Sequence, residues 1–254
     1  MPSRLAIITG GSSGIGRHLT RSLAASGFSV VFSYLTYADS VQTLVDEITA
    51  TGGRVLAVKS DVGSKVEVDH LFDTAVTWHG EAPSLLVNNA GIQTWSSLLE
   101  LEESSWDGVI RTNLKGCFLN TQAAGRLMKA SGRGGSIVNL GSGCNKLAFP
   151  RLVDYTASKG GIEQFTKVAA VELGPFGITV NCVAPGAVVT ERTVHEVPNY
   201  ESSWSALTPL GRVGTPADIS GVIAFFASPA AAFITGQTLW VDGGLFTRAS
   251  WPSA

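Results

Sequence analysis

Tyr155 and Lys159 stand four residues apart in a segment whose apolar residues recur at helical spacing. Side chains four apart share one face of a helix, so the phenol and the ammonium ion would be neighbours. A nearby ammonium ion favours the phenolate form of a phenol, which makes the pair a candidate general acid and base. Ser142 follows a strand-like run and could donate a hydrogen bond to a substrate oxygen that gains negative charge. Taken alone, such a pair is more often structural than catalytic, and a serine there could simply cap a turn.

A glycine-rich turn near the start of the chain is the second candidate. Thr9-Gly-Gly-Ser-Ser-Gly-Ile-Gly16 leads from a strand-like run into a segment, Arg17 to Ser26, that is predicted to be a helix. Glycines allow a tight turn and the close approach of a pyrophosphate, whose negative charge the helix N-terminus attracts. The spacing differs from the usual dinucleotide fingerprint, so a purely structural turn stays open. Asp61-Val62 and Asn88-Asn-Ala-Gly91 follow two other strand-like runs, where they could bind a ligand or merely cap a helix and make a turn.

The elements that must position these residues alternate along the whole chain. Seven short apolar runs, each separated from the next by enough residues for a crossover helix, lie at 5–8, 29–32, 54–58, 85–87, 136–140, 178–182 and 238–241. Runs that are apolar on both faces are typical of a parallel sheet covered by helices on both sides. No linker or repeat divides residues 1–254, which predicts one α/β domain with a doubly wound, seven-stranded parallel sheet. The segment 187–210 is predicted to be a substrate loop, with a disordered connector as the alternative.

Composition excludes several classes of function. The 254 residues carry 18 Lys+Arg and 20 Asp+Glu, a net charge of -2, which lacks the basic footprint that nucleic acids require. Only 15% of residues are charged, so some apolar surface is expected to lie between subunits. Three cysteines without metal-ligand spacing predict reduced thiols and no metal site. The uncharged stretch 219–241 contains Pro229 and Gly236 and is predicted to be helix, turn and strand, not a membrane span; no signal peptide is evident, and a cytoplasmic protein is expected.

Together the motifs resemble the compact short-chain dehydrogenase/reductase family, in the right order and over nearly the whole chain. The resemblance rests on Thr9–Gly16, Asn88–Gly91, Asn113, Ser142, Tyr155-Thr-Ala-Ser-Lys159 and Pro185-Gly-Ala-Val-Val-Thr190. It implies a Rossmann-type fold, NAD(P)(H) binding and a homotetramer. It also implies a catalytic tetrad in which Tyr155 is the acid and base, Lys159 binds the nicotinamide ribose and assists Tyr155, Ser142 positions the substrate, and Asn113 supports a proton-relay water.

The resemblance, with the glycine turn, also implies a cofactor site. Its expected residues are Gly10, Ser12, Ser13, Gly14, Ile15, Gly16, Asp61, Val62, Asn89, Ala90, Gly91, Tyr155, Lys159, Pro185, Gly186, Val188 and Thr190. Near the end of the second strand no carboxylate is present to bind the ribose 2′-hydroxyl of NAD. Hydroxyls at Ser13, Ser33, Tyr34 and Thr36 could receive a phosphate instead, so NADP(H) is expected to be preferred, with NAD(H) left open. Against this, many NADP-preferring relatives carry a basic residue at the position of Ser13.

The substrate is less defined. Polar Gln93, Asn145 and Arg151 and apolar Trp95, Leu147, Phe149, Tyr200 and Trp204 are candidates for its pocket. Residues 209–216 and 234–244 resemble 3-oxoacyl-carrier-protein reductases, whereas residues 155–162 also resemble glucose and polyol dehydrogenases. The expectation is an oxidoreductase acting on a small ketone or secondary alcohol; the alternatives are an NAD-dependent sugar or polyol dehydrogenase and a non-catalytic nicotinamide sensor or scaffold. The tail 245–254, with Phe246 and Trp251, is expected to dock, with a neighbouring subunit as one place for it.

Overall fold

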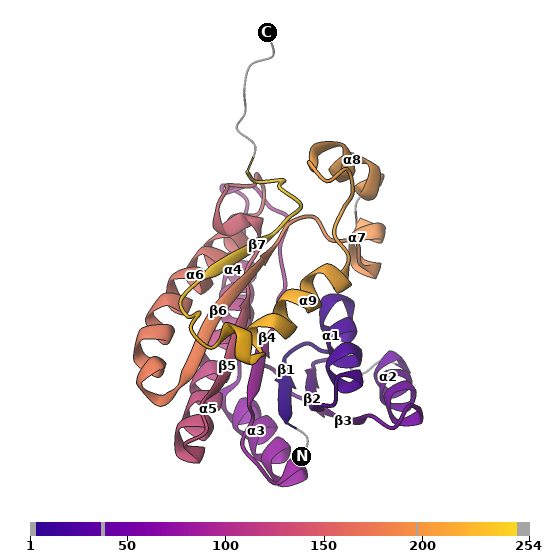
Figure 1. The fold of residues 1–254 in the computed structure, drawn as a ribbon. Coiled ribbons are helices and arrows are strands. Elements are labelled where there is room, and N and C mark those ends of the chain that lie inside the picture. Colours follow the sequence, from indigo (N-terminus) through magenta and orange to yellow (C-terminus); the bar gives the residue numbers. More distant parts are fainter. Residues whose placement is uncertain (1–3, 37–38, 197, 248–254) are drawn as a thin grey trace.

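The computed structural model describes residues 4–36, 39–196 and 198–247, and its centre is a sheet of seven parallel strands (Figure 1). The strands are β1 (Leu5–Ile8), β2 (Ser29–Tyr34), β3 (Arg54–Lys59), β4 (Leu85–Asn88), β5 (Gly135–Leu140), β6 (Ile178–Pro185) and β7 (Thr238–Val241). Their order across the sheet is β3-β2-β1-β4-β5-β6-β7. Every strand-like run lies within one of these strands, which confirms the predicted doubly wound α/β sheet.

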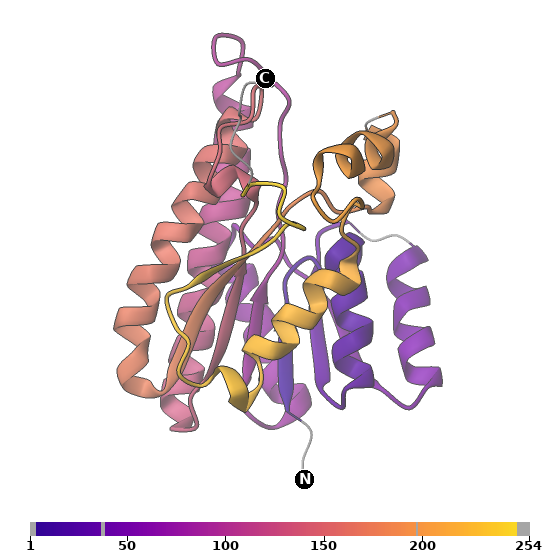
Figure 2. The same cartoon turned by 45° about the horizontal axis from the view of Figure 1, so that its top comes forward.

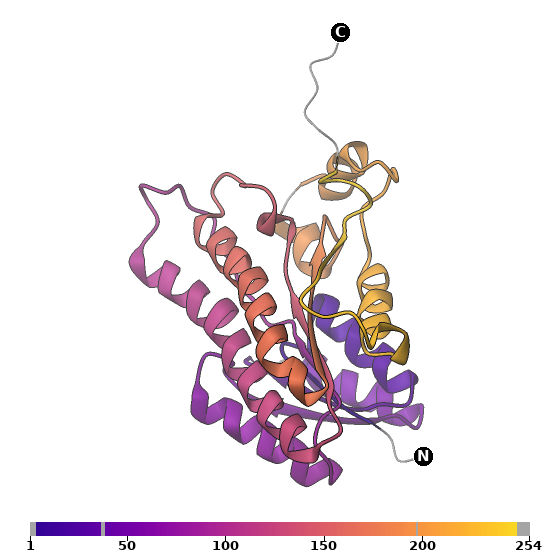
Figure 3. The same cartoon turned by 60° about the vertical axis from the view of Figure 1, so that its left-hand side comes forward.

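Helices cover both faces of this sheet, α1, α2 and α9 on one and α3, α5 and α6 on the other (Figures 1 and 3). The helices are α1 (Gly14–Ala25), α2 (Asp39–Ala50), α3 (Lys65–His79), α4 (Glu103–Val109), α5 (Gly116–Ser131), α6 (Val153–Leu173), α7 (Glu191–Glu196), α8 (Tyr200–Leu207) and α9 (Pro216–Phe226). A π-helical segment, η1 (Ile110–Lys115), joins α4 to α5, and short 3-10 turns occupy η2 (Gly143–Asn145), η3 (Gly174–Phe176) and η4 (Pro229–Ala231). Side chains alternate along β1, so Ala6 and Ile8 enter the core beneath α1 while Leu5 and Ile7 enter the core beneath α5.

The functional edge of the sheet is set by the direction of its strands. Ile8 pairs with Phe32 on one side and with Val87 on the other, so the turns after β1, β2 and β4 emerge together. The chain order reverses between β1 and β4, and ligands of such sheets bind in the crevice beyond this point.

Two predictions about local structure were wrong. The segment 187–210 is not a continuous loop, because it contains α7 and α8, which lie beyond the carboxyl ends of the strands (Figure 2). These helices span 6 and 8 residues, too short for a clear apolar period. Helix α1 begins at Gly14, three residues before the predicted start at Arg17. The first turn of this helix contains Gly14 and Gly16, and because glycine has a low helix propensity the sequence did not indicate a helix there.

Candidate active site

One cleft of about 1160 Å³ runs along the carboxyl edge of the sheet. It is lined by the glycine turn, by residues that follow β3, β4, β5 and β6, by Tyr155 and Lys159, and by α8. Pockets for drug-sized ligands measure about 300–1,000 Å³, so this cleft has room for a dinucleotide and a small substrate together.

The glycine turn has backbone geometry that only glycine adopts readily. Gly10 and Gly14 have φ values of +63° and +50°. A Cβ on Gly10 would lie 3.0 Å from Cα of Ala90, and one on Gly16 would lie 2.2 Å from the carbonyl oxygen of Gly10. The amide group of Asn89 donates to the same carbonyl oxygen at 2.9 Å. Gly16 therefore permits close packing within the turn but does not line the cleft, whereas the other glycine-turn residues of the predicted set do.

The end of β2 contributes alternate residues to the cleft. Ser33 and Leu35 line it, and Ser33 Oγ accepts a hydrogen bond from the amide of Gly10 at 3.1 Å. The predicted Tyr34 and Thr36 are not among the lining residues, because successive side chains of a strand point to opposite sides. Arg17, which was predicted only as a helix residue, also lines the cleft. A cation in the first turn of a helix opposes the helix dipole, and that signal could have pointed to an anionic ligand.

Asp61 and Val62 line the cleft at the end of β3. Asp61 Oδ2 accepts a hydrogen bond from the Arg111 guanidinium at 2.5 Å, and Oδ1 accepts one from the amide of Gly63 at 2.9 Å. Partial burial alone would raise the pKa of the Asp61 carboxyl, but the Arg111 guanidinium and the Gly63 amide outweigh it and hold that pKa below its usual range. Asp61 is thus a fixed carboxylate that also orders its own loop.

Ser142, Tyr155 and Lys159 meet in the same cleft. Lys159 is only 4% exposed, and its Nζ donates to the carbonyl oxygen of Leu140, at the end of β5, at 2.7 Å. The ammonium lies 5.4 Å from the centre of the Tyr155 ring. Lys159 takes part in none of the salt bridges found among the described residues, and a buried cation favours negative charge that develops beside it. Ser142 Oγ accepts from the amide of Cys144 at 3.3 Å, which orients the hydroxyl at the start of η2.

Asn113 is not among the residues that line the cleft, but it contacts segments that carry Gly91 and Tyr155. It lies in the π-helical segment, a local distortion often found at functional sites. Its side chain accepts from the amide of Ile92 at 2.8 Å and donates to the carbonyl oxygen of Ile92 at 2.9 Å and to Ser158 Oγ at 3.0 Å. The side-chain amide therefore ties η1 to the segment after Gly91 and to α6. Sequence spacing alone gave no indication of Asn113.

The predicted substrate residues fall into two groups. Gln93, Trp95 and Trp204 line the cleft. Asn145 does not, because its Oδ1 accepts from the amide of Ser142 at 3.1 Å as part of the cap of η2. Arg151 also lies outside the lining; it is exposed, has a φ of +66°, and uses its carbonyl oxygen to accept from the amide of Ser96 at 3.0 Å.

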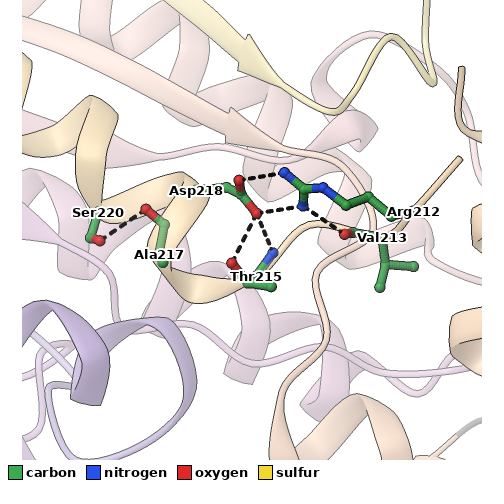
Figure 4. Close-up of polar contacts among 6 residues, drawn as sticks. All are labelled: Arg212, Val213, Thr215, Ala217, Asp218 and Ser220. Carbon is green, nitrogen blue, oxygen red and sulfur yellow. Dashed lines mark hydrogen bonds and ion pairs between the residues drawn. The ribbon is translucent and has the colours of Figure 1, made fainter. Parts of the chain in front are cut away.

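The two ends of the segment that carries α7 and α8 are joined by backbone contacts. Val188 and Gly214 form a parallel bridge, in which the amide of Val189 donates to the Gly214 carbonyl oxygen at 2.9 Å. Asp218 then accepts from both terminal nitrogens of Arg212, each at 2.8 Å, and from the amide of Thr215 at 2.7 Å (Figure 4). These bonds fix where the chain leaves the cleft wall and enters α9.

The described part of the C-terminal segment docks on this same subunit. Asp242 Oδ2 accepts from the amide of Phe246 at 3.0 Å, which turns the Phe246 side chain toward the cleft. The ring lies against Gly143, where a Cβ would come within 2.1 Å of Phe246 Cε2. It also packs edge-to-face on Phe149, with 5.7 Å between ring centres. The prediction for Trp251 falls outside the described residues.

All three cysteines are buried thiols. Burial raises the pKa of Cys117 to about 12 and that of Cys182 to about 11, and it also raises the pKa of Cys144, which lines the cleft. Among the described residues no group of three or more His, Cys, Asp or Glu side chains could hold a metal ion. Over the same residues, no helix combines the length and apolar character needed to cross a membrane.

Comparison with known proteins places this cleft in context. Residues 10–246 match a family model described as enoyl-(acyl carrier protein) reductase. The chain is 40% identical to a 3-oxoacyl-[acyl-carrier-protein] reductase of Synechocystis sp. over 246 residues, which cover 96% of this chain and 98% of the relative. A solved short-chain dehydrogenase/reductase from Serratia marcescens is 34% identical with a TM-score of 0.90, covering 97% of this chain and all of its own. A gluconate 5-dehydrogenase from Burkholderia cenocepacia, solved with NADP and tartrate, is 34% identical with a TM-score of 0.89 over 98% of this chain and 97% of that one.

Proposed function

The chain belongs to the short-chain dehydrogenase/reductase family, and from that membership we propose an NADP(H)-preferring oxidoreductase that transfers hydride between nicotinamide and a ketone or secondary alcohol. The observation that carries the proposal is the meeting of Ser142, Tyr155 and Lys159 in the same cleft as the glycine turn. Oxidoreductase relatives and this complete set speak against a sensor or scaffold without chemistry.

The residues of the cleft fit a nicotinamide dinucleotide. The turn after β1 leaves no room for side chains at Gly10 and Gly16, and the backbone N–H groups at the start of α1 suit a pyrophosphate. Asp61 and Val62 would hold the adenine end, and Asn89, Gly91 and the segment 185–190 would hold the rest. The nicotinamide supplies or accepts the hydride.

The residues of the chain handle the proton and the developing charge. Tyr155 gives its phenolic proton to the carbonyl oxygen during reduction and removes the hydroxyl proton during oxidation. Lys159 has three N–H donors, of which Leu140 takes one, and its positive charge stabilises the Tyr155 oxygen when it is deprotonated. Ser142 donates its hydroxyl hydrogen to the same substrate oxygen as negative charge builds there.

The preference for NADP(H) is supported by the charges beside β2. Ser13, Ser33, Ser40 and Arg17 line this part of the cleft, whereas Asp39, on the first turn of α2, is not among the lining residues. Hydroxyls and a guanidinium suit a 2′-phosphate, and a carboxylate in that place would favour NAD. The relative solved with NADP adds support.

Nicotinamide absorbance tests the proposal directly. The protein should oxidise NADPH faster than NADH with simple ketones, and Tyr155→Phe should abolish turnover while leaving NADPH binding and Tm unchanged. Turnover retained by Tyr155→Phe would refute the assigned chemistry. Faster reduction of NAD than of NADP by a sugar or polyol would favour the alternative that the gluconate 5-dehydrogenase relative suggests.

We also propose a homotetramer. Exposed apolar side chains gather on α5 and α6, including Phe118, Val168 and Val171, and others lie near β7, including Phe233 and Leu239. Patches of this kind on two parts of one subunit suit two interfaces. Light scattering on the purified protein should give four times the mass of one chain, and a monomer would contradict the proposal.

A further inference from the structure

The half of the cleft beside Ser142 and Tyr155 is walled by aromatic rings. Trp95, Phe149 and Phe246 come from segments that contact the residues around Ser142 and Tyr155, and Tyr200 and Trp204 line the same cleft from α8. Trp95 is 51% exposed. Large apolar side chains that stay open to water in a cleft commonly mark a surface that a ligand covers.

Three of these rings, Trp95, Phe149 and Phe246, have contacts that place them near Ser142 and Tyr155. A bridge between Ser96 and Leu152 joins the segment of Trp95 to the residues just before Tyr155. Phe246 lies against Gly143, next to Ser142, and Phe149 meets Phe246 edge-to-face at 85°. Trp95, Phe149 and Phe246 therefore lie near the side chains of Ser142 and Tyr155, between which a carbonyl group would bind.

Trp204 and Tyr200 form the wall that α8 contributes. They stand four residues apart on α8, with ring centres 6.3 Å apart. Both side chains are only partly buried and line the cleft, so their rings add to the aromatic surface there.

Charged side chains gather in the other half of the cleft. Among the side chains that the structure describes, Arg17, Asp61 and Arg111 lie at the ends of β1 to β3. Glu191 and Arg192 also line the cleft and directly follow Thr190 in the chain. Thr190 lies beside the glycine turn, since its Cγ2 is 3.6 Å from a Cβ placed on Gly14. Lys159 is the charged residue beside the aromatic walls, and its ammonium is bonded to the Leu140 carbonyl oxygen. Arg17 and Arg111 are held at the ends of β1 to β3 by their contacts with Glu47 and Asp61, away from Ser142.

We propose that the preferred substrate is an uncharged ketone, or the matching secondary alcohol, with an aromatic ring next to the reacting carbon. Aromatic rings prefer edge-to-face or offset contacts with other rings, and five such surfaces here can offer them. An anionic group would lose hydration among these rings, and the buried Lys159 ammonium is already bonded to the Leu140 carbonyl oxygen. This inference rests on the hydride-transfer function proposed above and specifies its substrate class.

Two ketones of equal carbon number separate aromatic recognition from mere size. Acetophenone and cyclohexyl methyl ketone differ in the ring alone, and 4-acetylbenzoate adds a carboxylate to the aromatic ring. With NADPH, kcat/KM should be at least about tenfold higher for acetophenone than for either of the others. Equal values for the two neutral ketones, or a higher value for 4-acetylbenzoate, for 5-ketogluconate or for a 3-oxoacyl thioester, would overturn the inference and leave the hydride-transfer function standing.

Matched variants show whether the named rings cause the preference. Trp95→Leu and Phe246→Leu should each lower the ratio of kcat/KM for acetophenone to that for cyclohexyl methyl ketone by about threefold or more. Trp106→Leu, on α4, should leave the ratio unchanged, since this residue does not line the cleft. A ratio that responds equally to cleft and control variants would contradict the assignment.

Binding provides a readout that does not depend on turnover. In the presence of NADP, calorimetry on Tyr155→Phe should show tighter binding of acetophenone than of cyclohexyl methyl ketone. If no ketone is turned over by the unaltered protein but this difference in binding persists, the proposed reaction fails and the aromatic pocket stands. If neither ketone binds, or both bind equally, the aromatic pocket is refuted.

Discussion

Arg17 offers the sharpest test of cofactor selection. Its side chain is 17% exposed, lines the cleft beside the glycine turn, and keeps its Nη2 3.9 Å from Oε1 of Glu47. A hydrogen bond to a charged group contributes about 1.5–3 kcal/mol, which corresponds to a factor of about 10–150 in affinity. Coulomb's law at an effective dielectric constant of about 20 gives about 4 kcal/mol for one charge pair at about 4 Å, which serves as an upper bound. Arg17→Gln should therefore weaken NADPH binding about 10- to 100-fold.

Arg21 is the matched control, because it lies on the same helix and pairs with the same glutamate but does not line the cleft. Arg21→Gln should change NADPH binding by less than about twofold. Glu47→Gln should tighten NADPH binding, since it removes a competing carboxylate from Arg17. Fluorescence titration of NADPH and NADH with all three variants measures these effects. Equal weakening of both cofactors by Arg17→Gln would show that Arg17 does not contact the 2′-phosphate, and the reasoning would fail.

Three further changes test other parts of the site. Gly143→Ala would place a Cβ 2.1 Å from Phe246, so kcat/KM should fall at least about tenfold with NADPH affinity unchanged. Asp218→Asn removes the carboxylate that caps α9 and binds Arg212, and should lower Tm by about 2–6 °C at pH 7. The Arg212 guanidinium and the Thr215 amide hold the pKa of Asp218 far below its usual range, so this contribution is complete above about pH 4 and the difference in Tm should shrink as the pH falls below that value. Asn113→Ala removes hydrogen bonds to Ile92 and Ser158, so kcat and Tm should fall together.

For each of these three variants, a second variant or a specific result would test the stated cause. Phe246→Ala should restore much of the turnover of cyclohexyl methyl ketone lost in Gly143→Ala if the clash is the cause. Asp69→Asn breaks an exposed pair with Lys65 and should shift Tm by less than about 1 °C. A kcat lost without any change in Tm in Asn113→Ala would point to direct participation in the reaction and against a positioning role.

The sequence located the sheet well because each of its strands is a short run with apolar residues on both faces. The edge of the sheet that carries the cleft was equally accessible, since glycines and polar residues follow those runs at their carboxyl ends. Side-chain direction was harder to foresee. Tyr34 and Thr36 were predicted beside the cofactor, but strand alternation brings Ser33 and Leu35 to the cleft in their place. Asn145 was predicted in the substrate pocket, but its side chain instead caps a turn through the Ser142 amide.

The substrate half of the cleft depends on contacts between residues far apart in the chain, and no local pattern encodes such contacts. Phe246 reaches Gly143 because Asp242 orders the turn that follows β7, and Trp95 faces the cleft because a bridge joins residues 96 and 152. The half of the cleft beside the glycine turn, in contrast, is lined by turns that follow neighbouring strands. Under the proposed function, the fold would hold the cofactor largely through backbone turns, whereas a few aromatic side chains on separate segments would determine which carbonyl compound reaches Tyr155. Exchanging those side chains should change the substrate and leave cofactor binding intact.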